Sequence, residues 1–200
     1  MALRACLHTS PRKLMNCLKI LFLGPVASGK SYIANFLSDA VEQGSIEYRP
    51  TKGVRILEYD LMAKHDAEMT KVELQLWDTS GSKRYQNCWP VIFKGAHGVV
   101  LVYNADQPNQ ANELDEWYET AISQSLVKDS NCCLIQHTLP QTTEKNNVDL
   151  SQKLSNLTII KSRLPSHGDS LREAFSKFVG RLINNLTEAT EQEELTIINS

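Results

Sequence analysis

The stretch "GPVASGKS", residues 24–31, is the feature that most restricts the fold of this chain. It matches the pattern G-x-x-x-x-G-K-[ST], in which a glycine-rich loop joins a strand to a helix and surrounds phosphate groups. The apolar run "CLKILFLG" (17–24) precedes it, and apolar residues at helical spacing follow it in "SYIANFLSDAVEQG" (31–44). A chance Gly-Lys-Ser turn is the alternative. The motif in this context predicts an α/β domain with a phosphate site at the end of its first strand.

The residues of this loop have separate predicted roles. Glycine at both ends lets backbone N–H groups curl around phosphate oxygens. Lys30 would reach the β- and γ-phosphates, and the Ser31 hydroxyl would bind Mg²⁺. The predicted phosphate-binding residues of the loop are Gly24, Ser28, Gly29, Lys30 and Ser31.

The predicted site is completed by three more residues, which lie further along the chain. Asp78 ends the apolar strand "VELQLWD" and is the expected acid for the metal, while the Gly81 backbone N–H could approach the γ-phosphate. Thr51, in "YRPTKGV", lies between the first helix and the next strands, where its hydroxyl could close over Mg²⁺. A strand-ending Asp and an ordinary Pro-Thr turn are the alternatives. We therefore predict Ser31, Thr51 and Asp78 as metal ligands, and we add Thr51 and Gly81 to the phosphate-binding residues.

The hydrophobic pattern predicts strands that alternate with helices. "VRILEYDL" (54–61) and "TKVELQLWD" (70–78) indicate an antiparallel pair joined by the polar connection "MAKHDAEM" (62–69). Further strands are predicted at 97–106, 131–137 and 157–162, a crossover helix at 112–126, a polar loop with at most a short helix at 138–153, and a closing helix at 170–186. This order predicts a doubly wound, mostly parallel α/β sheet, the small-GTPase class of fold.

We divide the chain into three parts. Residues 1–17 carry three basic residues and no acid, and we predict a disordered N-terminal extension. Residues 18–188 form the predicted domain, and residues 189–200 form an acidic tail that is solvated or used for interaction.

Composition excludes some partners. A net charge of -2 gives no reason to expect nucleic acid, which needs a basic face. The five cysteines form no CxxC pair, so reduced intracellular thiols fit better than a zinc site or a disulfide framework. The sequence ends in "LTIINS", without the cysteine that prenylation requires, so no lipid anchor is expected.

With these elements in order, the chain resembles a Rab-like small GTPase of the Ras superfamily. More narrowly, "YRPTKGVRILEYD", "WDTSGS" and "CWPVIFKGAHGVVLVYNAD" are similar to the Rab-like small-GTPase subunit of intraflagellar transport complex B. The resemblance runs from about residue 18 to the "EELTI" near the end. It implies binding of GTP or GDP with Mg²⁺, coiled-coil subunits of complex B as partners, and a cytoplasmic protein that reaches the basal body and the cilium or flagellum.

The chain departs from the family pattern at the base. Small GTPases usually read guanine with N-K-x-D after the fifth strand, and here "LIQHTLP" stands in its place. His137 and Thr138 are the predicted base-binding region, although the acid that selects guanine is absent. Base discrimination should therefore be weakened.

A second departure lies in "WDTSGS", where Ser82 replaces the glutamine that usually orients the attacking water. We therefore assign no catalytic residue and expect at most a slow GTPase. Two alternatives remain: a P-loop kinase of a small metabolite, and an interaction module that binds no nucleotide.

Overall fold

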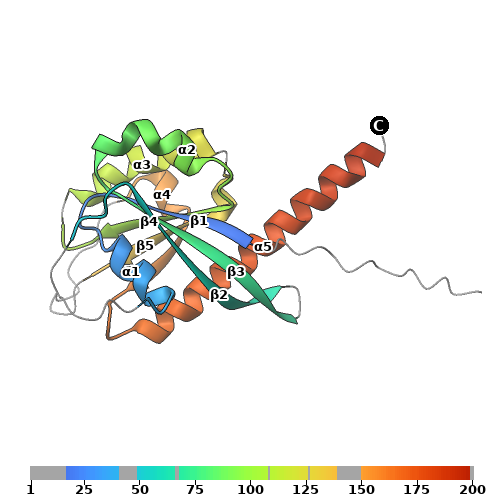
Figure 1. The fold of residues 1–200 in the computed structure, drawn as a ribbon, viewed down its shortest axis with the longest axis horizontal. Coiled ribbons are helices and arrows are strands. Elements are labelled where there is room, and N and C mark those ends of the chain that lie inside the picture. The colour runs from blue at the N-terminus through green and yellow to red at the C-terminus, as the bar shows by residue number, and fades with distance from the viewer. Residues whose placement is uncertain are drawn as a thin grey trace, which may run out of the picture.

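A computed structural model describes residues 17–40, 49–65, 68–107, 109–125, 127–138 and 150–198. These residues form a six-stranded sheet in the order β2-β3-β1-β4-β5-β6, with helices on both faces (Figure 1). The strands are β1 (Cys17–Leu23), β2 (Val54–His65), β3 (Glu68–Thr79), β4 (Gly98–Asn104), β5 (Cys132–His137) and β6 (Thr158–Ser162). β2 pairs antiparallel with β3, and the other neighbouring strands are parallel. The predicted doubly wound, mostly parallel α/β fold is confirmed.

The central strands are buried on both faces, which explains their continuous apolar sequences. Successive side chains of a strand point to opposite faces. In β1, Leu18, Ile20 and Phe22 therefore join one hydrophobic core, while Leu21 and Leu23 join the other. The sheet thus separates two cores, and each core needs its own covering helices.

The helices divide between these two faces (Figure 1). The first core is covered by α1 and α5, and the second by α2, α3 and the short α4. The helices are α1 (Lys30–Leu37), α2 (Trp89–Phe93), α3 (Gln110–Ser125), α4 (Gln152–Ser155) and α5 (Gly168–Ile198), with 3-10 turns η1 (Lys83–Cys88) and η2 (Asp129–Asn131). Because the parallel strands β1, β3, β4 and β5 end at the same edge of the sheet, the loops that follow them meet there.

The hairpin β2–β3 is longer than the sequence predicts. We expected "MAKHDAEM" to be a polar connection, but β2 continues to His65 and β3 begins at Glu68. Ala63 in this extension is fully buried, because α5 crosses the hairpin there. A Cβ at Gly180 of α5 would lie 2.4 Å from the Lys64 carbonyl oxygen, so glycine permits the close approach. Ala63 is buried by a helix far along the chain, so the local pattern of apolar and polar residues could not predict this burial.

Two helix ends also differ from expectation. Helix α1 ends at Leu37, where the Ser38 hydroxyl donates to the Ala34 carbonyl at 2.8 Å, instead of continuing toward Gly44. Helix α5 continues without a break through the predicted acidic tail to Ile198, and its last part extends away from the sheet (Figure 1). Residues 1–16 and 41–48 lie outside the described residues, so the predicted extension is not tested. No helix within the described ranges is both long enough and apolar enough to cross a membrane.

Candidate functional site

The loop between β1 and α1 depends on both glycines of its motif. Gly24 has φ 142°, and a Cβ there would lie 2.1 Å from the Val102 carbonyl oxygen of β4. Gly29 has φ 95°, and a Cβ there would lie 2.7 Å from Cδ2 of His137. Side chains rarely adopt such φ values, and neither position has room for one. The loop is therefore held close to the carboxyl ends of β4 and β5.

Lys30 begins α1 and turns back into the loop. Its side chain is 5% exposed, and Nζ donates to the Gly24 carbonyl at 2.9 Å, the Pro25 carbonyl at 2.6 Å and the Ser28 hydroxyl at 3.3 Å. Burial lowers the pKa of Lys30 to about 8, while the negative charge of Asp78 opposes that shift. The structure thus places a buried cation inside the predicted phosphate loop.

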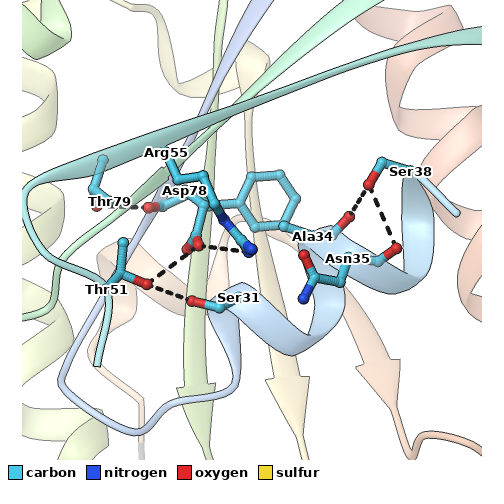
Figure 2. Close-up of polar contacts among 9 residues, drawn as sticks. Ser31, Ala34, Asn35, Ser38, Thr51, Arg55, Asp78 and Thr79 are labelled. Atoms are coloured by element: carbon cyan, nitrogen blue, oxygen red, sulfur yellow. Dashed lines mark hydrogen bonds and ion pairs between the residues drawn. The ribbon is translucent and has the colours of Figure 1, made fainter. Parts of the chain in front are cut away.

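The three predicted metal ligands lie together at this edge of the sheet (Figure 2). The Ser31 and Thr51 hydroxyl oxygens are 2.7 Å apart, and Thr51 Oγ1 donates to Asp78 Oδ2 at 3.3 Å. Asp78 is fully buried, and its other oxygen, Oδ1, has no hydrogen-bond partner among the residues that the structure describes. Hydroxyl and carboxylate oxygens are ligands that Mg²⁺ prefers, and Oδ1 is an acceptor for a metal-bound water. The residues therefore fit a magnesium ion.

Backbone contacts hold this group in place. The Thr79 hydroxyl donates to the Phe22 carbonyl of β1 at 2.7 Å, next to Asp78. The Ser80 N–H donates to the Gly53 carbonyl at 2.7 Å, which ties the segment of Thr51 to the end of β3. The three residues come from three separate segments, and the sheet brings them together.

Gly81 lies against the phosphate loop. A Cβ at Gly81 would be 2.5 Å from the Pro25 carbonyl carbon and 2.5 Å from the Val26 nitrogen. The turn after β3 therefore touches the loop after β1, which is the proximity that the predicted role of Gly81 requires. Beyond it, the Ser82 N–H donates to the Ser80 hydroxyl at 3.2 Å.

The predicted base-binding residues lie at the end of β5. His137 is 3% exposed, and its Nδ1 is 3.2 Å from the Ser162 hydroxyl, while its ring meets that of Tyr32 edge to face. Burial lowers the pKa of His137. The Thr138 N–H donates to the Ser162 carbonyl at 2.9 Å. The His137 ring therefore packs against the backbone of Gly29. Its contact with a base stays a prediction.

Comparison with known proteins gives the family. The family model described as "Roc: Ras of Complex, Roc, domain of DAPkinase" matches residues 19–139. Intraflagellar transport protein 22 homologs from Rattus norvegicus and Homo sapiens are 39% and 38% identical over 182 residues, which is 90% of this chain and 97% of each relative. The chain belongs to the intraflagellar transport protein 22 family. The resemblance found in the sequence is confirmed, and the kinase alternative is left without support.

Solved structures of this family have the same fold. The GTP-bound T. brucei IFT22/74/81 crystal structure matches with a TM-score of 0.68 and 29% identity, over 86% of this chain and 98% of that chain. The GDP-bound T. brucei IFT22 crystal structure matches with a TM-score of 0.64 and 27% identity, over 84% and 96%. Between 84% and 86% of this chain thus falls within the matched fold.

The structure adds two polar residues that the sequence did not single out. Gln110 of α3 donates from Nε2 to the Val26 carbonyl at 2.9 Å and accepts from the Asn104 N–H at 2.8 Å, which links the phosphate loop to the end of β4. Arg55 of β2 lies 3.1 Å from Asp78 Oδ2 through its NH2 group. Its place opposite Asp78 follows from the β2–β3 register, which the predicted antiparallel pair did not specify.

The buried charge of Lys30 gives a prediction of pH dependence. Without added ligand, we expect Lys30→Met to be more stable than the native protein at about pH 7, because the native fold then buries a charged amine. Between the folded pKa of about 8 and the unfolded value near 10.4, the unfolded native chain binds more protons, so native stability rises with pH relative to the variant. Urea unfolding of both proteins from about pH 7 to about pH 10 measures this narrowing difference.

Lys52→Met is the control, because it removes an exposed lysine from the segment next to Thr51. Its stability difference from native should stay nearly constant over the same range. If the stability difference between Lys30→Met and native also stayed constant with pH, the prediction that Lys30 is buried with a lowered pKa would be wrong.

Proposed function

We propose that this chain binds GTP or GDP with Mg²⁺ and acts as a Rab-like subunit of intraflagellar transport complex B in cilium or flagellum assembly. It would dock on coiled-coil subunits of the complex and be held there by protein contacts. It would work in the cytoplasm, at the basal body and in the cilium or flagellum. We also propose residues 18–188 as the nucleotide-binding domain.

The observation that carries the proposal is the contact between Ser31, Thr51 and Asp78 beside the buried Lys30. Mg²⁺, when bound, would neutralise charge on the phosphate groups. Ser31, Thr51 and Asp78 would hold it, and Lys30 would exchange its contacts with loop carbonyls for phosphate oxygens. The backbone around Gly24, Gly29 and Gly81 would supply N–H donors, with Ser28.

The relatives support the remainder of the proposal. Crystal structures of T. brucei IFT22 are GDP-bound and GTP-bound, and one contains IFT22/74/81. Names of this family refer to intraflagellar transport. Because the match covers 97% of the rat relative, the comparison extends over nearly the whole length of that protein.

Lys30→Ala should weaken nucleotide binding. Loss of a charge-assisted contact costs about 1.5 to 3 kcal/mol, which is roughly ten- to a hundredfold in affinity. Titration of a fluorescent guanine nucleotide in excess Mg²⁺ measures the change. Lys153→Ala is the control, since Lys153 is exposed and pairs with Glu119 of α3 at 2.5 Å. Equal affinity of native and Lys30→Ala would remove the phosphate-loop assignment, and no binding by the native protein would favour the interaction module without nucleotide.

Base discrimination should be weak. A site built to hydrogen-bond one ligand rejects an analogue by about 10⁴ or more, because its buried polar groups are left unpaired. Here no acid stands at the usual place, and we propose that His137 and Thr138 border the base. Competition of GTP and ATP against the fluorescent nucleotide should give a preference below about 10⁴. A larger preference would mean that another group reads the base.

Slow hydrolysis follows from Ser82. Phosphoryl transfer depends on positioning and electrostatic stabilisation, and a serine hydroxyl is too short to hold a water from the place of a glutamine amide. The Ser82 backbone is tied to Ser80, so its side chain has a fixed starting point beside Gly81. The metal and phosphate residues can thus hold the nucleotide while the attacking water lacks an orienting group.

Single-turnover hydrolysis by the native protein should be no faster than roughly 10⁻⁴ s⁻¹, and Ser82→Gln should raise the rate. Arg84→Gln is the matched control, because it places the same amide two residues further along η1. A native rate well above roughly 10⁻³ s⁻¹ without a partner would contradict the slow switch. Equal rates for native and Ser82→Gln would show that the loop position, and not the side chain, limits hydrolysis.

A further inference from the structure

We propose that Arg55 balances the negative charge of Asp78 and thereby weakens the binding of a divalent metal at this carboxylate. The site would then keep much of its affinity for nucleotide when Mg²⁺ is removed. The inference rests on the proposed nucleotide binding and names a residue that regulates the same site. It concerns how strongly metal and nucleotide depend on each other.

The sheet register places Arg55 at the metal site. Arg55 is directly opposite Asp78 in the antiparallel pair β2–β3, so both side chains lie on the same face of the sheet. The Arg55 NH2 group donates to Asp78 Oδ2 at 3.1 Å, and Thr51 donates to the same oxygen (Figure 2). Arg55 is 33% exposed, whereas Asp78 is fully buried. The guanidinium therefore covers the carboxylate from the solvent side.

This contact gives the charge of Asp78 a positively charged partner at Oδ2 without a metal. A buried carboxylate without a charged partner would be strongly destabilising, and removing one partner of such a pair leaves an uncompensated charge. A second cation, Lys30, lies near this carboxylate, because it precedes Ser31, whose hydroxyl contacts that of Thr51, and Thr51 donates to Asp78. Two positive side chains thus surround one carboxylate.

This balance of charge weakens the protein's own hold on a divalent cation. The hydroxyls of Ser31 and Thr51 are neutral, so Asp78 supplies the negative charge among the three predicted ligands. Arg55 offsets that charge and repels a cation placed beside Thr51. The metal would then be held chiefly by the phosphates, and its removal would leave Asp78 still paired with Arg55.

Removing Arg55 should therefore make the site depend on Mg²⁺. We would measure the dissociation constant of fluorescent GDP in excess Mg²⁺ and in excess EDTA, for the native protein, Arg55→Gln and Arg55→Lys. The ratio of the two constants should be below about tenfold for the native protein and at least about tenfold larger for Arg55→Gln, because Asp78 becomes a full anion for the metal. Arg55→Lys keeps the charge and should lie near native.

Lys71→Gln is the matched control. It removes one positive charge from the same hairpin, where Lys71 pairs with Asp60 at 2.8 Å and both side chains are more than half exposed. Its ratio should equal the native ratio. An Arg55→Gln ratio within about twofold of native would overturn the proposal.

Thermal unfolding without nucleotide separates this proposal from the proposed function. Arg55→Gln should melt below native in EDTA and recover part of that loss in excess Mg²⁺, while the native protein should respond little to the metal. An ion pair with a purely structural role would lower the melting temperature equally in both conditions, and that result would also overturn the proposal. If no protein binds nucleotide, the proposed function fails and the unfolding comparison still decides the role of Arg55.

Discussion

The buried carboxylate of Asp78 is the constraint around which the site is built. It lies at the end of β3 with no exposed surface, and a charge in that position needs hydrogen bonds and cations nearby. Thr51 and Arg55 donate to Oδ2, and Lys30 supplies a second positive charge. For this reason three parts of the chain meet at Asp78: the segment of Thr51, the edge strand β2 and the phosphate loop.

The sheet makes that meeting possible. Parallel strands that begin and end together bring their following loops to one edge, so residues far apart in sequence become neighbours. The glycines then set how closely the loops approach. Gly24 faces the backbone of β4, Gly29 faces the ring of His137, and Gly81 faces the backbone of Pro25. A side chain at Gly24 or Gly29 would push the phosphate loop away from β4 or β5, and one at Gly81 would push the turn after β3 away from that loop.

The nucleotide site follows the family pattern on its phosphate and metal side and departs from that pattern on its base side. The phosphate and metal side keeps the residues that the Ras-like pattern requires, and the structure brings Ser31, Thr51 and Asp78 into contact. On the base side the guanine-reading acid is replaced, and His137 is buried beneath the phosphate loop. The phosphate and metal side thus follows the Ras-like pattern, and the base side departs from it.

The sequence by itself determined the fold class and the order of the central strands along the chain, and it singled out the residues that we propose for phosphate and metal, because these depend on local pattern and on a motif with fixed spacing. Only the tertiary structure decided the length of the β2–β3 hairpin, the burial of His137, and the contacts of Gln110 and Arg55. Ala63 is buried because α5 crosses the hairpin at Gly180, and Arg55 meets Asp78 because of the strand register. Both effects join segments distant in sequence, so no local pattern of apolar and polar residues contains them.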